Sequence, residues 1–333
     1  MPGSTDRRSF SHDYDCLMTD IASTGFPHIA VLLPCYNEEM AIPIVVRDFR
    51  KVLPDATIYV YDNNSRDRTI EVARAAGAVV GSETVQGKGN VVRRMFADVE
   101  ADVYVIADGD DAYDAAAAPR LISILLEHQL DMVNARRVTD AVEAYRAGHR
   151  FGNKLLSSMV YMIFGDRCRD VLSGYRVLSR RFVKSFPALS EGFEIETELT
   201  IHALELRMPM AEVDTAYKAR SEGSVSKLRT YRDGIRICLN IFYLVKEERP
   251  LPFFGAIFLA LALLSGAISV PIFTTYFETG LVPRFPTAVL ATGTMVVGFL
   301  SLVCGLVLDT VTLGRREAKR MRYLAHPAPR RPG

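Results

Sequence analysis

The N-terminal two thirds of the chain alternates short apolar runs with segments of helical periodicity. HIAVLLP (28–34), ATIYVYD (56–62) and DVYVIAD (102–108) are rich in β-branched and aromatic residues, and each ends at a polar turn. Helical spacing predicts helices over 39–52 and 68–76. Strands that alternate with helices are typical of a mainly parallel, doubly wound α/β sheet. Such sheets bind ligands beyond the carboxyl ends of their strands, where these polar turns lie.

The same pattern continues up to about residue 218. Further strands are predicted in AVVGSE (78–83) and DMVNA (131–135), with helices near 90–99 and 117–128. Residues 148–218 are predicted to be α+β, with helices near 150–164 and 194–206 and a strand in PMAEVDTAYKA (209–219).

Two long uncharged stretches follow near the C-terminus. Residues 251–277 and 285–308 contain no Asp, Glu, Lys or Arg over 27 and 24 positions. A helix needs about 20 apolar residues to cross a bilayer, so both stretches predict membrane spans, with a pair of buried core helices as the alternative. The tail after 308 is basic. By the positive-inside rule, the tail and the N-terminal domain then both face the cytoplasm.

Residues 226–249 directly precede the first predicted span. They carry apolar residues at helical spacing on one side and Lys and Arg on the other. This predicts an amphipathic helix that lies at the anionic membrane surface, with an ordinary solvated helix as the alternative. The expected organisation is an N-terminal arm (1–27), an α/β catalytic domain (28–225), the amphipathic helix (226–249), a two-helix transmembrane hairpin (250–309) and a basic cytoplasmic tail (310–333).

Composition excludes some classes of protein. A net charge of +1 over 333 residues gives no reason to expect a nucleic-acid partner. The five cysteines are scattered and form no CxxC, which argues against a disulfide framework or a zinc site. The first residues contain no apolar run of the kind that a signal peptide needs.

The run DVYVIADGDDAYD (102–114) holds the most informative chemistry. A buried strand is expected to deliver four aspartates within seven positions, and such a cluster needs a positive partner. Asp108 and Asp110, spaced D-x-D on a turn, can share one Mg²⁺ or Mn²⁺, because these hard cations prefer oxygen ligands and bind phosphates at the same time. The alternative is an acidic surface turn that caps the next helix.

Four motifs together carry a resemblance. VLLPCYNEE, YDNNSRDRT, GKGNVVRR and DGDDAYD, in this order and spacing, resemble family 2 glycosyltransferases of the GT-A fold. DVLSGYRVLSRR, GFEIETEL and ARSEGSVSKLRTYRDG are similar to polyprenyl-phosphate glycosyltransferases, the group that contains dolichol-phosphate mannose synthase. The resemblance covers about 28–236, and the paired C-terminal spans match the bacterial branch.

The resemblance implies roles for individual residues. Those expected to bind the nucleotide sugar are Pro34, Tyr36, Asn37, Glu38, Asp62, Lys88, Asp108 and Arg136. Those expected to bind the acceptor phosphate are Arg150, Asn153, Ser173, Arg176, Arg220, Ser226 and Lys227. Asp108 and Asp110 are the implied metal ligands, and the implied catalytic groups are Asp110, Arg176, Arg220 and Lys227. The chain departs from the family at Ala112, where dolichol-phosphate mannose synthases often carry a glutamine.

The implied reaction moves a single sugar from a nucleotide sugar to polyprenyl phosphate of the undecaprenyl or dodecaprenyl type, at the cytoplasmic face of the inner membrane. The product would serve cell-envelope glycan or lipopolysaccharide modification. The lipid phosphate is largely dianionic at neutral pH, so it needs positive charge rather than a strong base, and in-line attack inverts the anomeric centre. Uridine diphosphate is the expected carrier. The sugar (glucose, galactose, mannose, an amino sugar or a uronic acid) stays open, and relatives with two spans suggest a tetramer.

Two other functions compete with this one. A glycosyltransferase that uses a sugar hydroxyl as acceptor needs a general base, for which Glu194 and Glu196 are the candidates. Processive synthases of that type usually carry a QxxRW-like motif, and this chain has no Trp. The other alternative is a non-catalytic membrane module that only binds a nucleotide sugar, which a complete D-x-D and intact basic segments make less attractive.

Overall fold

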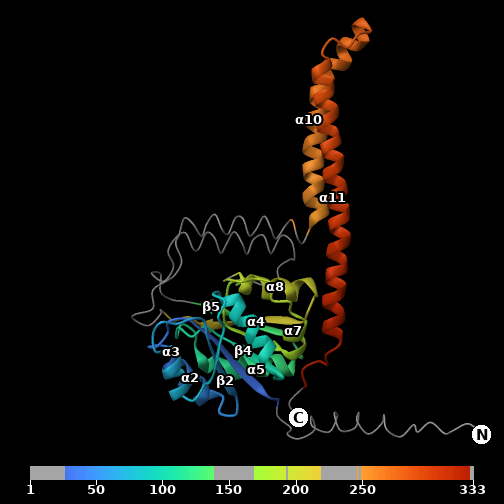
Figure 1. Cartoon of the computed structure of the whole chain (residues 1–333). Helices are drawn as coiled ribbons and strands as arrows, with labels where there is room; N and C mark the ends of the chain where they lie inside the picture. The colour runs from blue at the N-terminus through green and yellow to red at the C-terminus, as the bar shows by residue number, and fades with distance from the viewer. Residues whose placement is uncertain (1–26, 139–168, 193, 219–245, 247–248, 331–333) are drawn as a thin grey trace, which may run out of the picture.

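The computed structural model shows an α/β domain beside two long helices (Figure 1). It describes residues 27–138, 169–192, 194–218, 246 and 249–330. The predicted N-terminal arm and most of the predicted amphipathic helix at 226–249 lie outside these residues.

A seven-stranded sheet forms the centre of the domain, in the order β3-β2-β1-β4-β6-β5-β7. Its strands are β1 (Ile29–Cys35), β2 (Thr57–Asp62), β3 (Val79–Ser82), β4 (Val103–Ile106), β5 (Met132–Val138), β6 (Arg176–Ser179) and β7 (Met210–Ala216). All neighbouring strands are parallel except β6, which runs antiparallel to β4 and to β5. The predicted mainly parallel α/β sheet is therefore confirmed.

Helices cover both faces of this sheet. They are α2 (Ile42–Val52), α3 (Thr69–Ala75), α4 (Lys88–Asp98), the 3-10 turn η1 (Ala115–Ala117), α5 (Ala118–Glu127), α7 (Arg180–Ser185) and α8 (Ile195–Glu205). Strand β1 shows why a layer of helices is needed on each face of the sheet. Val31 and Leu33 belong to the apolar core under α2 and α5, whereas Leu32 belongs to the core under α4, α7 and α8. Alternate residues of a strand point to opposite faces, so a strand that is apolar throughout needs helices on both.

The register brings the carboxyl ends of β1, β2 and β4 to one edge. Cys35, the last residue of β1, pairs with Asp62, the last residue of β2. Leu32 pairs with Ile106 at the end of β4. The loops that follow these three strands, which carry most of the predicted nucleotide-binding residues, therefore leave the sheet side by side.

The C-terminal hairpin consists of α10 (Pro250–Thr279) and α11 (Phe285–Leu324), both long and apolar enough to cross a membrane. Three small residues of α11, spaced seven positions apart, are buried against α10: Ala291, Gly298 and Gly305. A Cβ at Gly305 would lie 2.9 Å from Phe254 Cβ, so the helices approach closely there. Only 6% and 17% of the two apolar windows are buried, which fits spans with lipid-facing sides better than core helices.

Helix α11 continues beyond α10 and runs alongside the α/β domain (Figure 1). It stays helical to Leu324, well into the segment predicted as a basic tail. The reason is tertiary, because this extension contacts α7 and α8 of the domain through Arg316, Lys319 and Tyr323.

Candidate active site

The loops after β1 and β2 form one hydrogen-bonded unit. The Asn37 amide donates to Ser65 Oγ over 2.8 Å, and Asn37 Oδ1 accepts from the Arg66 amide over 2.8 Å. The Glu38 amide donates to Thr69 Oγ1 over 2.9 Å. Asn37 has a φ of 53°, a left-handed conformation that asparagine tolerates better than most residues. These bonds fix the predicted nucleotide-binding loop against its neighbour.

Asp62 offers one unsatisfied oxygen at this edge. Its side chain is buried, and Oδ2 accepts from the Ser65 amide over 3.0 Å. Oδ1 is also buried and has no hydrogen-bond partner among the described residues. A buried acceptor left without a donor costs free energy, so this oxygen suits a donor group from a bound ligand.

Four carboxylates act electrostatically on the thiol of Cys35. Burial raises the pKa of this thiol, and the charges of Glu38, Asp62, Asp108 and Asp110 raise it further. All four are therefore within electrostatic reach of one sulfur atom at the end of β1. The structure thus brings together acidic residues that the sequence places in three separate motifs.

The D-x-D turn is packed tightly at both of its sides. A Cβ at Gly109 would lie 2.4 Å from Cys35 Sγ, and a Cβ at Gly174 would lie 2.8 Å from an Asp108 carboxylate oxygen. Asp110 is buried, and its Oδ1 accepts from the Ala112 amide over 3.2 Å. Close packing on both sides of the turn therefore helps to hold the two carboxylates in place.

The donor set fits a cation that is completed by the substrate. Among the described residues, no group of three or more His, Cys, Asp or Glu is arranged to hold a metal. Two carboxylates of one turn, Asp108 and Asp110, match the way Mg²⁺ and Mn²⁺ bind when phosphate oxygens and water fill the other positions. Ala112 cannot serve as a ligand, so Asp111, Asp114, water or the diphosphate would complete the shell.

Two glycines around Lys88 allow a close approach between α4 and the loop before α8. A Cβ at Gly87 would lie 2.2 Å from the Glu191 carbonyl oxygen, and one at Gly89 would lie 2.0 Å from the Ser190 carbonyl oxygen. Gly87 also has a φ of 138°, which disfavours any other residue. This packing explains the GKG motif, because it brings Lys88 at the start of α4 toward α8.

The Lys88 ammonium joins two carboxylates. It forms ion pairs with Asp108 at the end of β4 and with Glu196 in the first turn of α8, and the Lys88 and Glu196 side chains are only 11% and 8% exposed. Burial alone would lower the pKa of Lys88, but the two carboxylates outweigh it and hold that pKa above its ordinary value. Burial raises the pKa of Glu196, and its Oε2 has no hydrogen-bond partner among the described residues.

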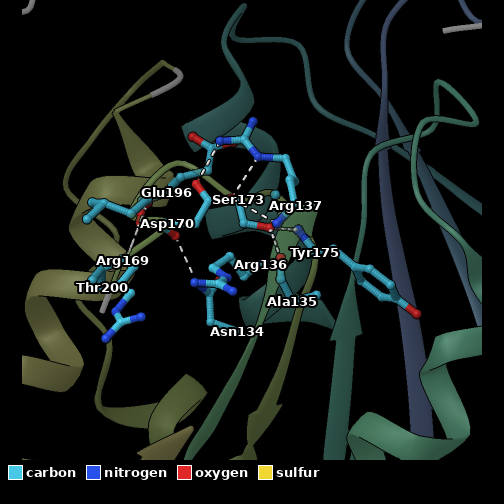
Figure 2. Close-up of polar contacts among 12 residues, drawn as sticks. Asn134, Ala135, Arg136, Arg137, Arg169, Asp170, Ser173, Tyr175, Glu196 and Thr200 are labelled. Carbon is cyan, nitrogen blue, oxygen red and sulfur yellow. Dashed lines mark hydrogen bonds and ion pairs between the residues drawn. The ribbon is translucent and has the colours of Figure 1, made fainter. Parts of the chain in front are cut away.

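Arg176 lies inside the domain rather than at an open face. It is fully buried, and its guanidinium donates to the carbonyl oxygens of Ser173 (3.0 Å), Val171 (2.8 Å) and Glu196 (2.8 Å). Ser173 Oγ in turn donates to the Ala135 carbonyl over 2.6 Å (Figure 2). In this arrangement Arg176 ties β6 to the first turn of α8, and contact with an acceptor phosphate would require the guanidinium to leave these carbonyls.

The two arginines of the NARR segment point to different carboxylates. Arg136 forms a two-point ion pair with Asp214 on β7, at 2.5 and 2.7 Å. Arg137 forms another with Asp170, at 2.8 and 2.7 Å, in the cluster shown in Figure 2. Burial would raise the pKa of Asp170, but its bonds to Arg137 hold that pKa below the usual value. The predicted sugar-binding role of Arg136 stays a prediction.

Most residues predicted for the nucleotide sugar lie at the carboxyl edge of the sheet. This group contains Pro34, Tyr36, Asn37, Glu38, Asp62, Lys88 and Asp108, and the predicted metal ligand Asp110 lies beside them. Five predicted acceptor residues lie outside the described residues: Arg150, Asn153, Arg220, Ser226 and Lys227. From the sequence, Glu196 had only a role as a possible base; its ion pair with Lys88 could not be predicted, because a sequence separation of 108 residues leaves no local signal.

Known proteins place the chain in a family. The model of glycosyl transferase family 2 matches residues 30–186. The chain is 55% identical to protein RfbJ of Shigella flexneri, over 37% of this chain and 96% of that protein. It is 29% identical to glycosyltransferase AglJ of Haloferax volcanii, over 89% of this chain and 98% of that one. A dolichyl-phosphate hexose transferase of the same organism is 29% identical, over 67% of this chain and 96% of its own length.

This protein therefore belongs to glycosyl transferase family 2, and the resemblance carried by its motifs is confirmed. The fold is similar to that of glucosyl-3-phosphoglycerate synthase from Mycobacterium tuberculosis, with a TM-score of 0.54 and 23% identity over 72% of this chain and 84% of that chain. That crystal structure is a complex with Mn²⁺ and uridine-diphosphate-glucose. The likeness confirms the expected GT-A fold.

Proposed function

We propose that this protein transfers a single sugar from a nucleotide sugar, with uridine diphosphate as carrier, to polyprenyl phosphate at the cytoplasmic face of the inner membrane. The observation that carries the proposal is the gathering of the Asp62, Asp108 and Asp110 carboxylates at the carboxyl edge of the sheet, where Asp62 and Asp110 are buried. Such a concentration of negative charge suits a cation that a diphosphate shares. The two long apolar helices next to the domain suit a lipid substrate.

Each donor-side residue has a role that follows from its environment. Asp62 Oδ1, buried and without a partner among the described residues, would accept from the base or ribose of the nucleotide. Asp108 and Asp110 would hold a divalent cation, Mg²⁺ or Mn²⁺, which when bound neutralises charge on the departing diphosphate. Lys88 keeps the Asp108 carboxylate oriented. The complex of a fold neighbour with Mn²⁺ and uridine-diphosphate-glucose supports this assignment.

The acceptor supplies its own nucleophile. A phosphate oxygen of the lipid attacks the anomeric carbon, the bond from that carbon to the diphosphate breaks, and the nucleoside diphosphate leaves with inversion. The phosphate is already deprotonated, so no side chain has to remove a proton. Arg150, Asn153, Arg220, Ser226 and Lys227 are the groups we assign to the lipid phosphate. The name of the dolichyl-phosphate hexose transferase among the relatives supports an acceptor of this class.

Arg176 acts indirectly, through the backbone carbonyl oxygens of Ser173 and Glu196. Because the guanidinium binds the carbonyl oxygens of residues 171, 173 and 196, Arg176 positions Glu196 and, through it, Lys88. We therefore propose Arg176 as a positioning residue in addition to the acceptor role that the family resemblance implies.

Extraction of labelled lipid tests the proposal. The full-length protein in nanodiscs with undecaprenyl phosphate would be incubated with Mn²⁺ and a panel of labelled uridine- and guanosine-diphosphate sugars. One donor is expected to give label that enters organic solvent and is released by mild acid. Asp110→Asn should abolish it, whereas Asp55→Asn, at an exposed carboxylate before β2, should not. Label found only in insoluble polymer, or none with any donor, would contradict the proposal.

A further inference from the structure

The extension of α11 beyond the hairpin completes two buried carboxylates of the α/β domain. Glu205, at the end of α8, has a side chain only 2% exposed, and it pairs with Arg316 Nε at 3.2 Å and Lys319 Nζ at 2.6 Å. Asp131, just before β5, has a fully buried side chain and accepts from Tyr323 Oη over 2.8 Å. Buried carboxylates are costly unless they are paired, so the domain depends on the membrane helix for part of its charge balance.

The Tyr323 contact is also an apolar one. Its ring lies under the guanidinium of Arg181, 4.8 Å from the guanidinium carbon to the ring centroid, and packs against the core beneath α4, α7 and α8. Arg181 itself forms an ion pair with Asp131. Tyr323 therefore contacts the domain through both its hydroxyl and its ring, which makes this end of α11 a specific docking segment rather than a solvated basic tail.

Two rigid elements lead from this docking segment to the active site. Helix α8 carries Glu205 at its last residue and Glu196 in its first turn, roughly 14 Å apart at the rise of an α-helix. Strand β6 carries Ser179, which donates to Asp131 over 2.7 Å, at one end and Arg176 at the other. At the site end the two elements are joined, because Arg176 donates to the Glu196 carbonyl. Lys88 then links Glu196 to Asp108.

We infer that residues 312–324 of α11 dock the catalytic domain on the membrane hairpin through Glu205 and Asp131, and so fix the position of the active site relative to the bilayer. Because both elements are regular and buried, a displacement of α11 would move Glu196 and Arg176 together. A phosphate anchored in the bilayer can reach the site only if the site is held at the right height, whereas a dissolved phosphate can approach freely. The inference rests on the proposed acceptor class, and it assigns Glu205, Arg316 and Lys319 as positioning residues.

Transfer to two acceptors separates a positioning role from a merely structural one. The full-length protein in nanodiscs would be assayed with membrane-embedded undecaprenyl phosphate and with a short, water-soluble prenyl phosphate. Replacing both Arg316 and Lys319 with alanine is expected to lower kcat/KM for the embedded acceptor about tenfold, with KM for the donor and kcat/KM for the soluble acceptor within about twofold of wild type. The milder Glu205→Gln should act in the same direction.

A matched variant controls for charge near the lipid headgroups. Arg315 and Arg320 are exposed on the same helix, so replacing both with alanine removes the same two charges without touching Glu205 and should leave both acceptors unaffected. An equal loss with both acceptors would show a structural role and overturn the inference. Unchanged kinetics in both the double variant and Glu205→Gln would overturn it as well.

A distance measurement gives a readout that does not depend on activity. Spin labels would be attached through Val79→Cys, at an exposed position of β3, and Leu259→Cys, at an exposed position of α10, in a variant without native cysteines. The wild-type docking segment should give one narrow distance distribution, which broadens when Arg316 and Lys319 are replaced. An equally narrow distribution in the variant would refute docking. If wild type transferred sugar to neither acceptor, the proposed function would fail while this measurement still decided the docking.

Discussion

Replacing Lys88 with methionine removes the only cation that the described residues place between Asp108 and Glu196. Methionine keeps an unbranched side chain of similar length, so the packing of GKG against the loop before α8 changes little. Glu196 then keeps a buried carboxylate without its partner, because its side chain is only 8% exposed. The substitution therefore isolates the electrostatic contribution of one ammonium group.

The size of the effect follows from burial. Breaking a buried ion pair by removing one partner costs about 3–5 kcal/mol, and Asp108 at 27% exposure recovers part of that through water. We expect about 3 kcal/mol for Lys88→Met at pH 7. For a domain of this size, each kcal/mol lowers the melting temperature by roughly 2–4 °C, so the loss should be roughly 6–12 °C. Transfer activity should fall as well, because the Asp108 carboxylate loses its orientation.

Acid should reduce the difference between variant and wild type. Glu196 already has a raised pKa because of burial, and the loss of Lys88 raises it further. A carboxyl group with a raised folded-state pKa is most compatible with the fold when it is protonated, so the variant recovers stability as the pH falls, by at most about 1.4 kcal/mol per pH unit. Thermal unfolding in detergent at several pH values measures this.

A second variant makes the reasoning refutable. Lys88→Met combined with Glu196→Gln removes both charges, and it should be more stable at pH 7 than Lys88→Met alone. If the single variant melted within about 1 °C of wild type, or if the double variant were no better than the single one, the buried ion pair would not have the energetic role assigned to it.

The remaining predictions concern other parts of the molecule. Burial lowers the pKa of His202 to about 3, so the neutral ring is favoured in the fold and stability is lost as the pH falls below about 6.5. From pH 6.5 to pH 5 the free energy of unfolding falls by about 2 kcal/mol for this reason, and His202→Gln should remove that part of the pH dependence. An unchanged pH dependence of stability would contradict the prediction. Gly305→Leu should lower the melting temperature by separating α11 from Phe254, at a cost of about 1–3 kcal/mol, whereas Gly314→Leu, with open space around its Cβ, should not; equal effects would refute the close approach. Asp62→Asn keeps an oxygen for the Ser65 amide but loses the charge, and it should raise KM for the donor about tenfold in steady-state assays, with the acceptor KM as the control.

Local patterns predicted much of the fold. The strands that became β1, β2 and β4 alternate with helices and end in polar turns, and parallel packing brings those turns to one edge without further information. The carboxylates of Asp62, Asp108 and Asp110 could therefore be placed together from the sequence. The two apolar stretches were visible because each holds more than 20 consecutive uncharged residues.

Long-range pairings could not be predicted in this way. Strand β6 inserts antiparallel between β4 and β5, a choice decided by partners far away in the chain. Arg176 looked like a surface or ligand-binding residue because isolated arginines are seldom buried, yet three carbonyl oxygens satisfy its guanidinium. Arg316 and Lys319 looked like ordinary positive-inside charges, and only the burial of Glu205 shows that they dock the domain.

The central claim is that a divalent cation at Asp108 and Asp110 and a lipid phosphate act together in sugar transfer. The most direct test is the rate of lipid labelling with polyprenyl phosphate and with the corresponding polyprenol, after chelation of divalent ions and again after Mn²⁺ is restored. We predict turnover only when both the phosphate and the cation are present. Full turnover in chelator, or equal turnover with polyprenol, would contradict the account.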